Sequence, residues 1–321
     1  MKYKTIFIYK IKIRLFLSIL FFPFLIISQS TTIAERIGFD KNTKFLIIHA
    51  DDIGLAHSVN TAAIKAFEGS GINSASIMVP CPWFPEIAAY AKGHTEYDFG
   101  LHLTLNSEWK NYRWGGVLPA SEIPSLLDKN NFFYRSVQEI VDNADLKEVE
   151  KELIAQVERA LAFGVKPTHL DNHMGSLFST PELFQIYLKI GKIYDLPVFI
   201  PMVAKKRYPE LMKLIDEQKV IVDNYMMMET NRPATEWNDY YINIIQQLKP
   251  GLNELIVHLA IDNSEMQAVM IDHTDFGSTW RQNDLNTMMS KEFKKALKNY
   301  NIKLITWKEI SYLLDKNDEK L

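Results

Sequence analysis

The sequence predicts an α/β fold, namely a single closed or nearly closed β/α barrel with about seven or eight parallel strands. Two observations lead to this prediction. Apolar runs of strand length alternate with longer segments of helical period, and no linker rich in Ser, Gly or Pro interrupts them. The length of 321 residues would allow two domains, but one unbroken series of strands and helices favours a single domain over residues 31–321.

Each predicted element follows from its local pattern, in chain order. The runs of strand length are residues 45–50, 74–79, 99–105, 168–171, 197–200, 220–222, 254–259 and 303–306. The segments of helical period are residues 58–68, 86–91, 146–163, 181–194, 234–248 and 291–300. Strands joined by helices of this length are expected to run parallel, because the helix returns the chain to the starting edge of the sheet.

A doubly wound open sheet is the alternative architecture. Such a sheet normally has a glycine-rich turn after its first strand, where phosphate groups bind. Here the corresponding turn reads Asp51-Asp52-Ile53-Gly54-Leu55, which is acidic and lacks repeated glycines. It would repel a phosphate, so the barrel is preferred.

The charge and the cysteine content exclude several classes of protein. Lys and Arg number 36 against 39 Asp and Glu, and the net charge is -3. Because no basic block stands out beyond residue 14, a nucleic-acid partner is not expected. The single cysteine, Cys81, allows neither an intrachain disulfide nor a thiolate metal site. Any metal must therefore be held by His, Asp or Glu.

The N-terminal residues 1–30 have the order of a secretory signal peptide. Basic residues up to Arg14 precede an apolar run at 15–27, and Ser28-Gln29-Ser30 forms a cleavage pattern of small residues. An uncleaved membrane anchor is the alternative, but the run has about 13 residues whereas about 20 span a bilayer. We therefore expect export to the periplasm or the outside, with no stable membrane span after cleavage.

Polar residues stand where the predicted strands end, and a parallel barrel places its catalytic groups there. Asp51 and Asp52 follow the first apolar run. Two adjacent carboxylates repel each other unless a cation or a shared proton offsets their charge. A role as a helix N-cap would account for one aspartate but not for both.

Histidines occur in the third and fourth predicted strands. His102 lies in an otherwise apolar run, and His169, Asp171 and His173 alternate in the next strand. Residues two apart in an extended chain point to the same side, although a structural role stays open for each histidine alone. Together with an aspartate of the first strand they predict a metal site. Its open positions suit hydrolysis, and zinc, magnesium or manganese would fit.

His258 follows the apolar residues Leu255 to Val257 and also stands at the end of a strand. A histidine titrates near neutral pH, and a nearby carboxylate can hold it protonated. In that state it can act as the acid that protonates a leaving group. A purely structural role is the alternative until the residue is placed opposite the metal site.

Four motifs in this order resemble those of a known family. They are HADDIG at 49–54, GLHLTL at 100–105, PTHLDNHMG at 167–175 and ELIVHLA at 254–260. This combination resembles the YdjC/ChbG family of carbohydrate deacetylases, which are related to the polysaccharide deacetylases and have a distorted β/α barrel. The resemblance extends over residues 45–310 and includes RQND at 281–284 and IKLITWKEI at 302–310.

The resemblance implies a role for each matching residue. Asp52, His102 and His173 would hold one divalent metal ion, zinc or magnesium, with manganese as a further option. Asp51 would be the general base, and His258 would be the acid. The chain departs from the family at two places, because MGS at 174–176 replaces further histidines and the family's His-Pro-Gly reads HLA at 258–260.

The expected reaction is hydrolysis of an N-acetyl group, or alternatively an O-acetyl group, on an amino sugar or oligosaccharide. We expect His169 and Asp171 to orient a metal-bound imidazole. Candidates for the sugar cleft are Trp83, Trp109, Trp280 and Arg281, while core packing stays the alternative for each aromatic ring. Two alternatives stay open: a metal-dependent hydrolase of another acyl or amide substrate, and a carbohydrate-binding protein without activity. The sequence indicates no oligomeric state.

Overall fold

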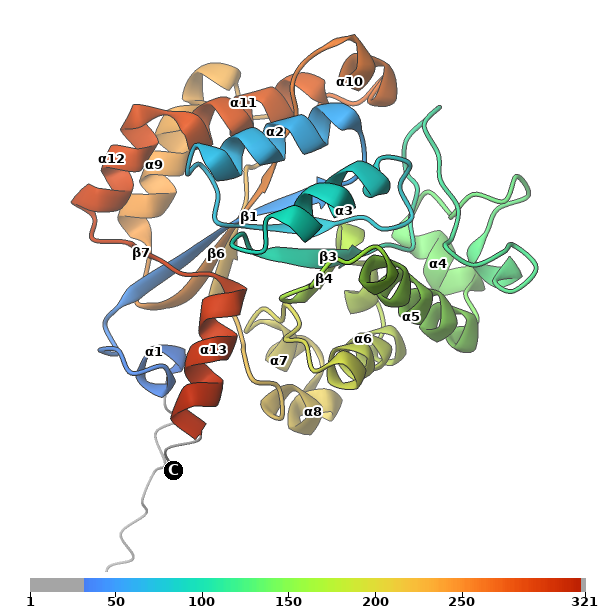
Figure 1. Cartoon of the computed structure of the whole chain (residues 1–321), viewed down its shortest axis with the longest axis horizontal. Helices are drawn as coiled ribbons and strands as arrows, with labels where there is room; N and C mark the ends of the chain where they lie inside the picture. Colours follow the sequence, from blue (N-terminus) through green and yellow to red (C-terminus); the bar gives the residue numbers. More distant parts are fainter. Residues whose placement is uncertain (1–31, 319–321) are drawn as a thin grey trace, which may run out of the picture. The chain divides into compact units, whose positions relative to one another are not determined.

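A sheet of parallel strands forms the centre of the fold in this computed structural model, which describes residues 32–318 (Figure 1). The strands are β1 (Lys44–Ile53), β2 (Ser74–Ile77), β3 (Phe99–Leu103), β4 (Leu170–Asn172), β5 (Asn224–Met226), β6 (Gly251–His258) and β7 (Lys303–Leu304). Their order is β4-β3-β2-β1-β6-β5, with β7 paired to the start of β1. All pairs are parallel, so the predicted α/β class is confirmed.

The helices lie on the outside of the sheet (Figure 1). They are α1 (Ile33–Arg36), α2 (His57–Glu68), α3 (Phe84–Gly93), α4 (Val137–Asn143), α5 (Leu146–Ala162), α6 (Pro181–Tyr194), α7 (Ala204–Arg207), α8 (Met212–Asp216), α9 (Trp237–Gln247), α10 (Ser264–Val269), α11 (Ser278–Met289), α12 (Lys291–Asn299) and α13 (Trp307–Asp318). Short 3-10 turns are η1 (Pro124–Leu126), η2 (His173–Phe178), η3 (Pro209–Leu211) and η4 (Ala234–Glu236). All six predicted helical segments are found, as α2, α3, α5, α6, α9 and α12.

Helix α5 shows how the local sequence sets an element. Asp145 caps it, because its side chain accepts hydrogen bonds from the backbone N–H groups of Lys147 and Glu148. Residues on one face, among them Val149, Leu153 and Val157, are buried at a spacing of four. This spacing is that of an amphipathic helix packed against a core, so the sequence pattern alone was sufficient here.

The barrel closes between β4 and β5 through single bridges. Two of the predicted strands, 197–200 and 220–222, are reduced to the isolated pairs Leu170↔Val198 and Pro201↔Val222. Prolines at 197 and 201 bracket the first segment and cannot donate a hydrogen bond to a ladder, which explains the interruption. The regular pairing resumes at β5, which the pattern did not predict. The result is the distorted barrel that the sequence predicts.

The interior of the barrel changes from apolar to polar along β1. Side chains at alternate positions lie on one side of a strand. Phe45 and Ile47 belong to an apolar cluster that includes residues of α1 and α13. The next residues on that side are His49 and Asp51, which are in contact with polar side chains. The N-terminal end of the barrel is therefore closed by apolar packing, and polar chemistry is restricted to the other end.

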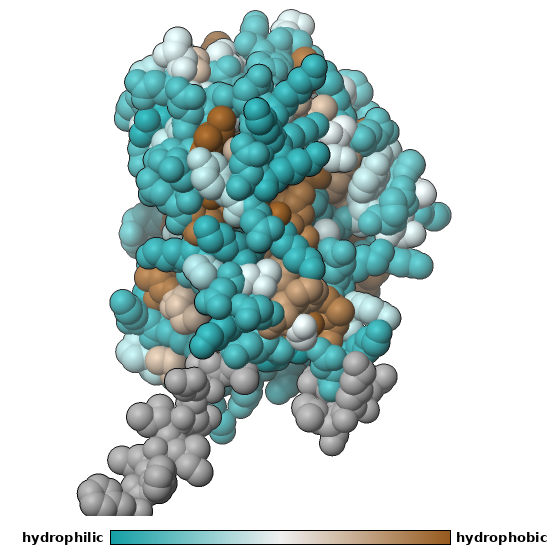
Figure 2. Space-filling view, turned by 90° about the vertical axis from the view of Figure 1, so that its left-hand side faces the viewer, coloured by the Kyte–Doolittle hydropathy of each residue, from teal (hydrophilic) through white to brown (hydrophobic). Residues whose placement is uncertain are grey.

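Figure 2 shows one face of the molecule, on which hydrophilic residues predominate and hydrophobic residues form small patches. Within residues 32–318, no helix has the length and apolar character needed to cross a membrane. The predicted signal peptide, residues 1–30, lies outside the described residues.

Candidate active site

A cavity of about 580 Å³ opens at the C-terminal ends of the strands. Its lining includes all five residues that the sequence predicts for metal binding and catalysis, namely Asp51, Asp52, His102, His173 and His258. Aromatic and aliphatic side chains form much of the remaining wall. They include Trp109, Phe178, Phe199, Tyr225, Ile256 and Phe276. The fold therefore brings together charged groups and a largely apolar chamber, as in many ligand sites.

Asp52, His102 and His173 form a triangle of possible ligand atoms. Asp52 Oδ1 lies 3.4 Å from His102 Nε2 and 3.2 Å from His173 Nδ1. The two ring nitrogens are 3.3 Å apart. An ion with bonds of about 2.1 Å and angles of about 100–110° would separate its ligands by roughly 3.2–3.4 Å. The three atoms thus match the spacing that one face of a metal site requires.

Two carboxylates fix the orientation of the histidine rings. His102 Nδ1 lies 2.7 Å from Asp171 Oδ1, and His173 Nε2 lies 3.0 Å from Glu108 Oε2. Each outer nitrogen can donate its proton to a carboxylate, which leaves each inner nitrogen free to turn a lone pair towards Asp52 Oδ1 once its own proton is lost. That oxygen is buried and has no hydrogen-bond partner among the described residues. After loss of these protons, the three facing atoms would fit a divalent cation.

The surroundings of His173 also favour positive charge at this place. Burial alone would lower the pKa of His173, but the charge of Glu108, its hydrogen bond to the ring and the nearby Asp52 raise it to about 9. The proton that His173 binds therefore occupies the position that a metal cation would take.

The backbone at the end of β1 directs both aspartates into the cavity. Neighbouring side chains of a strand normally point to opposite faces. Asp52 has φ 66°, in the left-handed region, and the pairing with β2 shifts between Ala50 and Ile53. Such irregularities redirect side chains and are common beside active sites. Because of this turn, Asp51 and Asp52 both line the cavity.

Arg281 of α11 supplies the buried counter-charge for Asp52. Its Nη2 atom lies 2.7 Å from Asp52 Oδ2, and the guanidinium is almost completely buried. Burial would raise the pKa of Asp52, but the charge of Arg281 and the neighbouring His102 and His173 hold it well below its usual range. Asp52 is therefore ionised, as a metal ligand must be.

Asp51 and His258 face each other from neighbouring strands. Asp51 Oδ2 lies 3.9 Å from His258 Nε2. Burial, with the charges of Asp171 and Asp52, raises the pKa of Asp51 to about 6. Burial also lowers the pKa of His258 to about 3, although the charge of Asp52 acts in the opposite direction. The expectation that a carboxylate holds His258 protonated is therefore wrong for this state of the site, because desolvation outweighs the attraction.

The residues predicted to contact substrate or to orient ligands divide into two groups. Trp109, Arg281 and Asp171 line the cavity, and Asp171 orients His102 as expected. Trp83 stacks near His57 with 5.0 Å between ring centroids, away from the lining. Trp280 packs between Trp237 and Phe276 in the shell behind the cavity.

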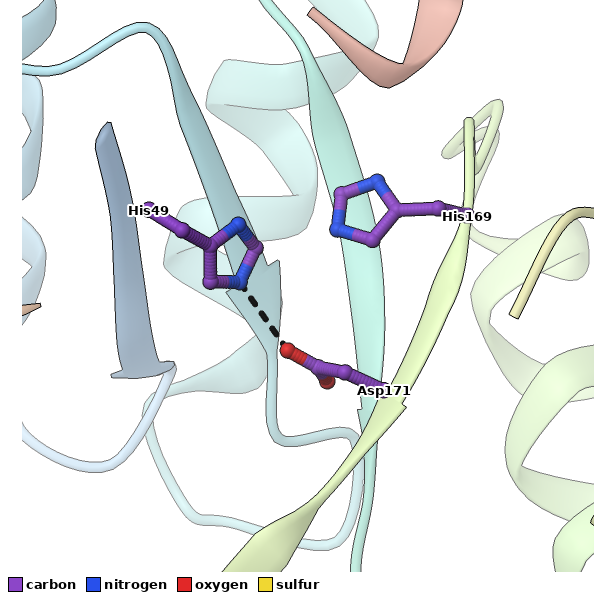
Figure 3. A group of neighbouring side chains, drawn as sticks. All are labelled: His49, His169 and Asp171. Atoms are coloured by element: carbon purple, nitrogen blue, oxygen red, sulfur yellow. Dashed lines mark hydrogen bonds and ion pairs between the residues drawn. The ribbon is translucent and has the colours of Figure 1, made fainter. Parts of the chain in front are cut away.

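His169 lies deeper in the barrel than the sequence suggests. The side chain is fully buried, its Nδ1 atom lies 2.9 Å from Thr168 Oγ1, and its ring stacks on Trp307. Its place beside Asp171 is taken by His49, whose Nε2 atom lies 2.9 Å from Asp171 Oδ2 (Figure 3). His49 stands two positions before Asp51, and this spacing was the signal that could have identified it.

Glu108 is the other residue that sequence reasoning missed. It lies in the irregular segment after β3 and touches His173. A single glutamate in a long loop carries no periodic signal, so only the fold reveals it.

The fold and the site define an α/β barrel with an Asp-His-His set of possible metal ligands. Residues 45–299 match the model of the YdjC-like protein family, and the chain belongs to that family. A carbohydrate deacetylase of Thermus thermophilus is 34% identical over 245 residues, covering 73% of this chain and 84% of the relative. A carbohydrate deacetylase of Thermoanaerobacter pseudethanolicus is 24% identical, covering 82% and 98%.

Among solved structures, a protein of Enterococcus faecalis named for cellobiose-phosphate cleavage has a similar fold. Its TM-score is 0.69 at 22% sequence identity, and the match covers 83% of this chain and 98% of that one. This likeness supports the architecture.

Proposed function

We propose that this protein is a metal-dependent carbohydrate deacetylase that releases acetate from an N-acetylated amino sugar or oligosaccharide. The observation that supports it most directly is the Asp52, His102 and His173 triangle beside Asp51 in an open cavity. The names of the curated relatives point to the same reaction. Export through residues 1–30 would bring the protein to its substrate outside the cytoplasm.

The metal would be held by Asp52, His102 and His173. When bound, a divalent ion would polarise the acetyl carbonyl and lower the pKa of the attacking water. Zinc, magnesium and manganese all accept oxygen and imidazole ligands, so the donor set leaves this choice open. Arg281 keeps Asp52 ionised and fixed through their ion pair, while Asp171 and Glu108 hold the two imidazole rings in place.

Proton transfer is assigned to Asp51 and His258. Asp51, with a pKa of about 6, is ionised at neutral pH and basic enough to accept a proton from the attacking water. The new C–O bond forms first and the amide C–N bond breaks in the following step, for which the amine nitrogen needs a proton in order to leave. Because His258 starts neutral, the proton that it gives to the amine comes from the attacking water by way of Asp51, 3.9 Å away.

The cavity wall suits a sugar ring. The ring of Trp109 is held by Arg281 and His273, with the guanidinium carbon 5.8 Å and the imidazole centroid 4.5 Å from it. A rigid ring can stack on the apolar face of a pyranose. Phe199 and Tyr225 of β5 pack edge to face and form a second aromatic wall.

The proposal is tested with the purified mature chain. The protein is freed of metal by a chelator, reloaded with zinc, magnesium or manganese, and incubated with acetylated chito-oligosaccharides while acetate is measured. We expect acetate release that depends on the added metal. Sugar binding without acetate release at any metal would instead favour a carbohydrate-binding protein, and release from simple amides but not from sugars would favour another hydrolase.

A further inference from the structure

His49 occupies a position that the proposed reaction does not yet use. The side chain is fully buried in the barrel, beneath the cavity and on the same side of β1 as Asp51. Its Nε2 atom lies 2.9 Å from Asp171 Oδ2 and 3.4 Å from Asp51 Oδ1. One ring nitrogen thus touches both the carboxylate that orients His102 and the proposed general base.

The hydroxyl groups of β2 complete the surroundings of the ring. Ser74 Oγ lies 2.9 Å from His49 Nδ1, and Ser76 Oγ lies 3.0 Å from His49 Nε2. Ser76 donates its own proton to Asp171 Oδ2 at 2.7 Å. Both ring nitrogens therefore have partners, and the ring is fixed in position.

The charges around the ring favour its protonated form. Burial alone would lower the pKa of His49, but Asp171 and Glu254 raise it to about 9. The imidazolium is a buried cation between negative groups.

A second metal site is the alternative for this group. His49, His169 and Asp171 offer three atoms within 4.8 Å of one another (Figure 3). Both nitrogens of His49 are already engaged, however, and one of them lies at hydrogen-bond distance from Asp171. An ion at this place would therefore have to displace the hydrogen bonds that the ring already makes.

We propose that His49 is a positioning residue that clamps two carboxylates at once: Asp51, which accepts the proton, and Asp171, which orients the metal ligand His102. This inference rests on the proposed deacetylase function for its kinetic consequence. Its consequence for metal affinity does not depend on that function, because Asp171 acts on His102 whatever the substrate is.

Two isosteric replacements of His49 test the contacts of its two ring nitrogens one at a time. The amide nitrogen of His49→Gln falls near Nε2 and can still donate to Asp171 and Asp51. The amide nitrogen of His49→Asn falls near Nδ1 and reaches only towards Ser74. A matched control is His169→Asn, a buried histidine deeper in the barrel that hydrogen-bonds Thr168 instead.

We expect His49→Asn to lower kcat about 30- to 100-fold at saturating metal, with KM changed less than about threefold, and to weaken metal binding about tenfold by calorimetry. His49→Gln should recover at least about tenfold of the lost kcat, whereas His169→Asn should lower the melting temperature but keep kcat within about threefold. Metal analysis should give one ion per chain in the wild type and in each variant.

Several outcomes would overturn the clamp. Equal kcat losses in His49→Asn and His49→Gln would show that the Nε2 contacts are unimportant, and an equal loss in His169→Asn would show a general packing effect. Two ions per wild-type chain, one of them lost in His49→Asn, would make His49 a ligand. If the wild type releases no acetate, the deacetylase proposal fails. The role of His49 is then judged by metal affinity alone, and an unchanged affinity in His49→Asn would contradict it.

Discussion

Asp51 on β1 and His258 on β6 are register partners in the parallel sheet, and their side chains meet over the cavity at 3.9 Å. Their environments move the two pKa values in opposite directions from their usual ranges, so that a proton between the two groups rests on Asp51 and not on His258. Groups with such perturbed pKa values in a cleft are typical of catalytic sites. The proposed base and the proposed acid therefore stand side by side at the cavity.

Removing the base should leave the metal site intact. Asp51→Asn keeps the volume of the side chain but cannot accept a proton, so we expect kcat to fall about 10²- to 10⁴-fold. Metal content, measured on the same sample, should stay at the wild-type value because Asp52, His102 and His173 are untouched. Near wild-type turnover in this variant would remove Asp51 from the mechanism.

The role of Glu108 can be tested through metal affinity. Glu108→Gln can still accept the hydrogen bond of His173 but loses the negative charge. We expect the dissociation constant for zinc to rise about tenfold, since partners of ligating histidines typically contribute 10- to 100-fold. Isothermal titration provides the measurement, and Glu122→Gln, which removes an exposed carboxylate that pairs with Lys151, is the matched control. An unchanged constant would mean that Glu108 does not support the ligand.

Arg281 should be more important for stability without metal than with it. Arg281→Met leaves Asp52 as a buried carboxylate without its counter-ion, so we expect the free energy of unfolding to fall by about 3–5 kcal/mol in the metal-free protein. A bound cation would replace part of the lost charge and reduce this loss. Urea unfolding with and without zinc compares the two states, and an equal loss in both would contradict the assignment of Asp52 as a ligand.

Metal affinity should rise with pH. In the metal-free protein His173 has a pKa raised to about 9, so metal binding at pH 6 to 8 must displace its proton, and affinity should increase up to about tenfold per pH unit. The raised pKa of His173 also stabilises the metal-free fold. This contribution is complete below about pH 6.5, the pKa of histidine in the unfolded chain, and is lost as the pH rises through 9. Titrations at pH 6, 7 and 8 measure the first effect. A pH-independent constant would place the metal elsewhere.

Much of the architecture followed from the sequence because its signals are periodic. Helix α5 buries residues at a spacing of four, strand β6 is a nearly continuous buried run, and both were predicted. Helix α11 was missed because it has no apolar face: Arg281 and Asp284 are buried beside Trp280 and Leu285. A helix that buries charged groups for function cannot be recognised from hydrophobic spacing.

The candidate site likewise contains residues that the sequence predicts and residues that it does not. Asp52, His102 and His173 could be identified because they end strands and stand in motifs, and parallel strands bring their ends together. His49 and His169 each lie two positions before an aspartate, so the pattern could not decide which one reaches Asp171. The depth of each ring in the barrel decides it, since His169 stacks on Trp307 at the apolar end. Such depth depends on the tilt of the strands, which the sequence does not state.

The most direct test of the account measures bound metal and acetate release in the same samples. Metal-free protein is titrated with zinc in the presence of an N-acetylated chito-oligosaccharide, and the rate is plotted against ions bound per chain. The account predicts a rate that rises in proportion to occupancy and stops rising at one ion per chain, with no such rise in His102→Ala. Acetate release that is equal in metal-free and metal-loaded protein, or absent at full occupancy, would contradict it.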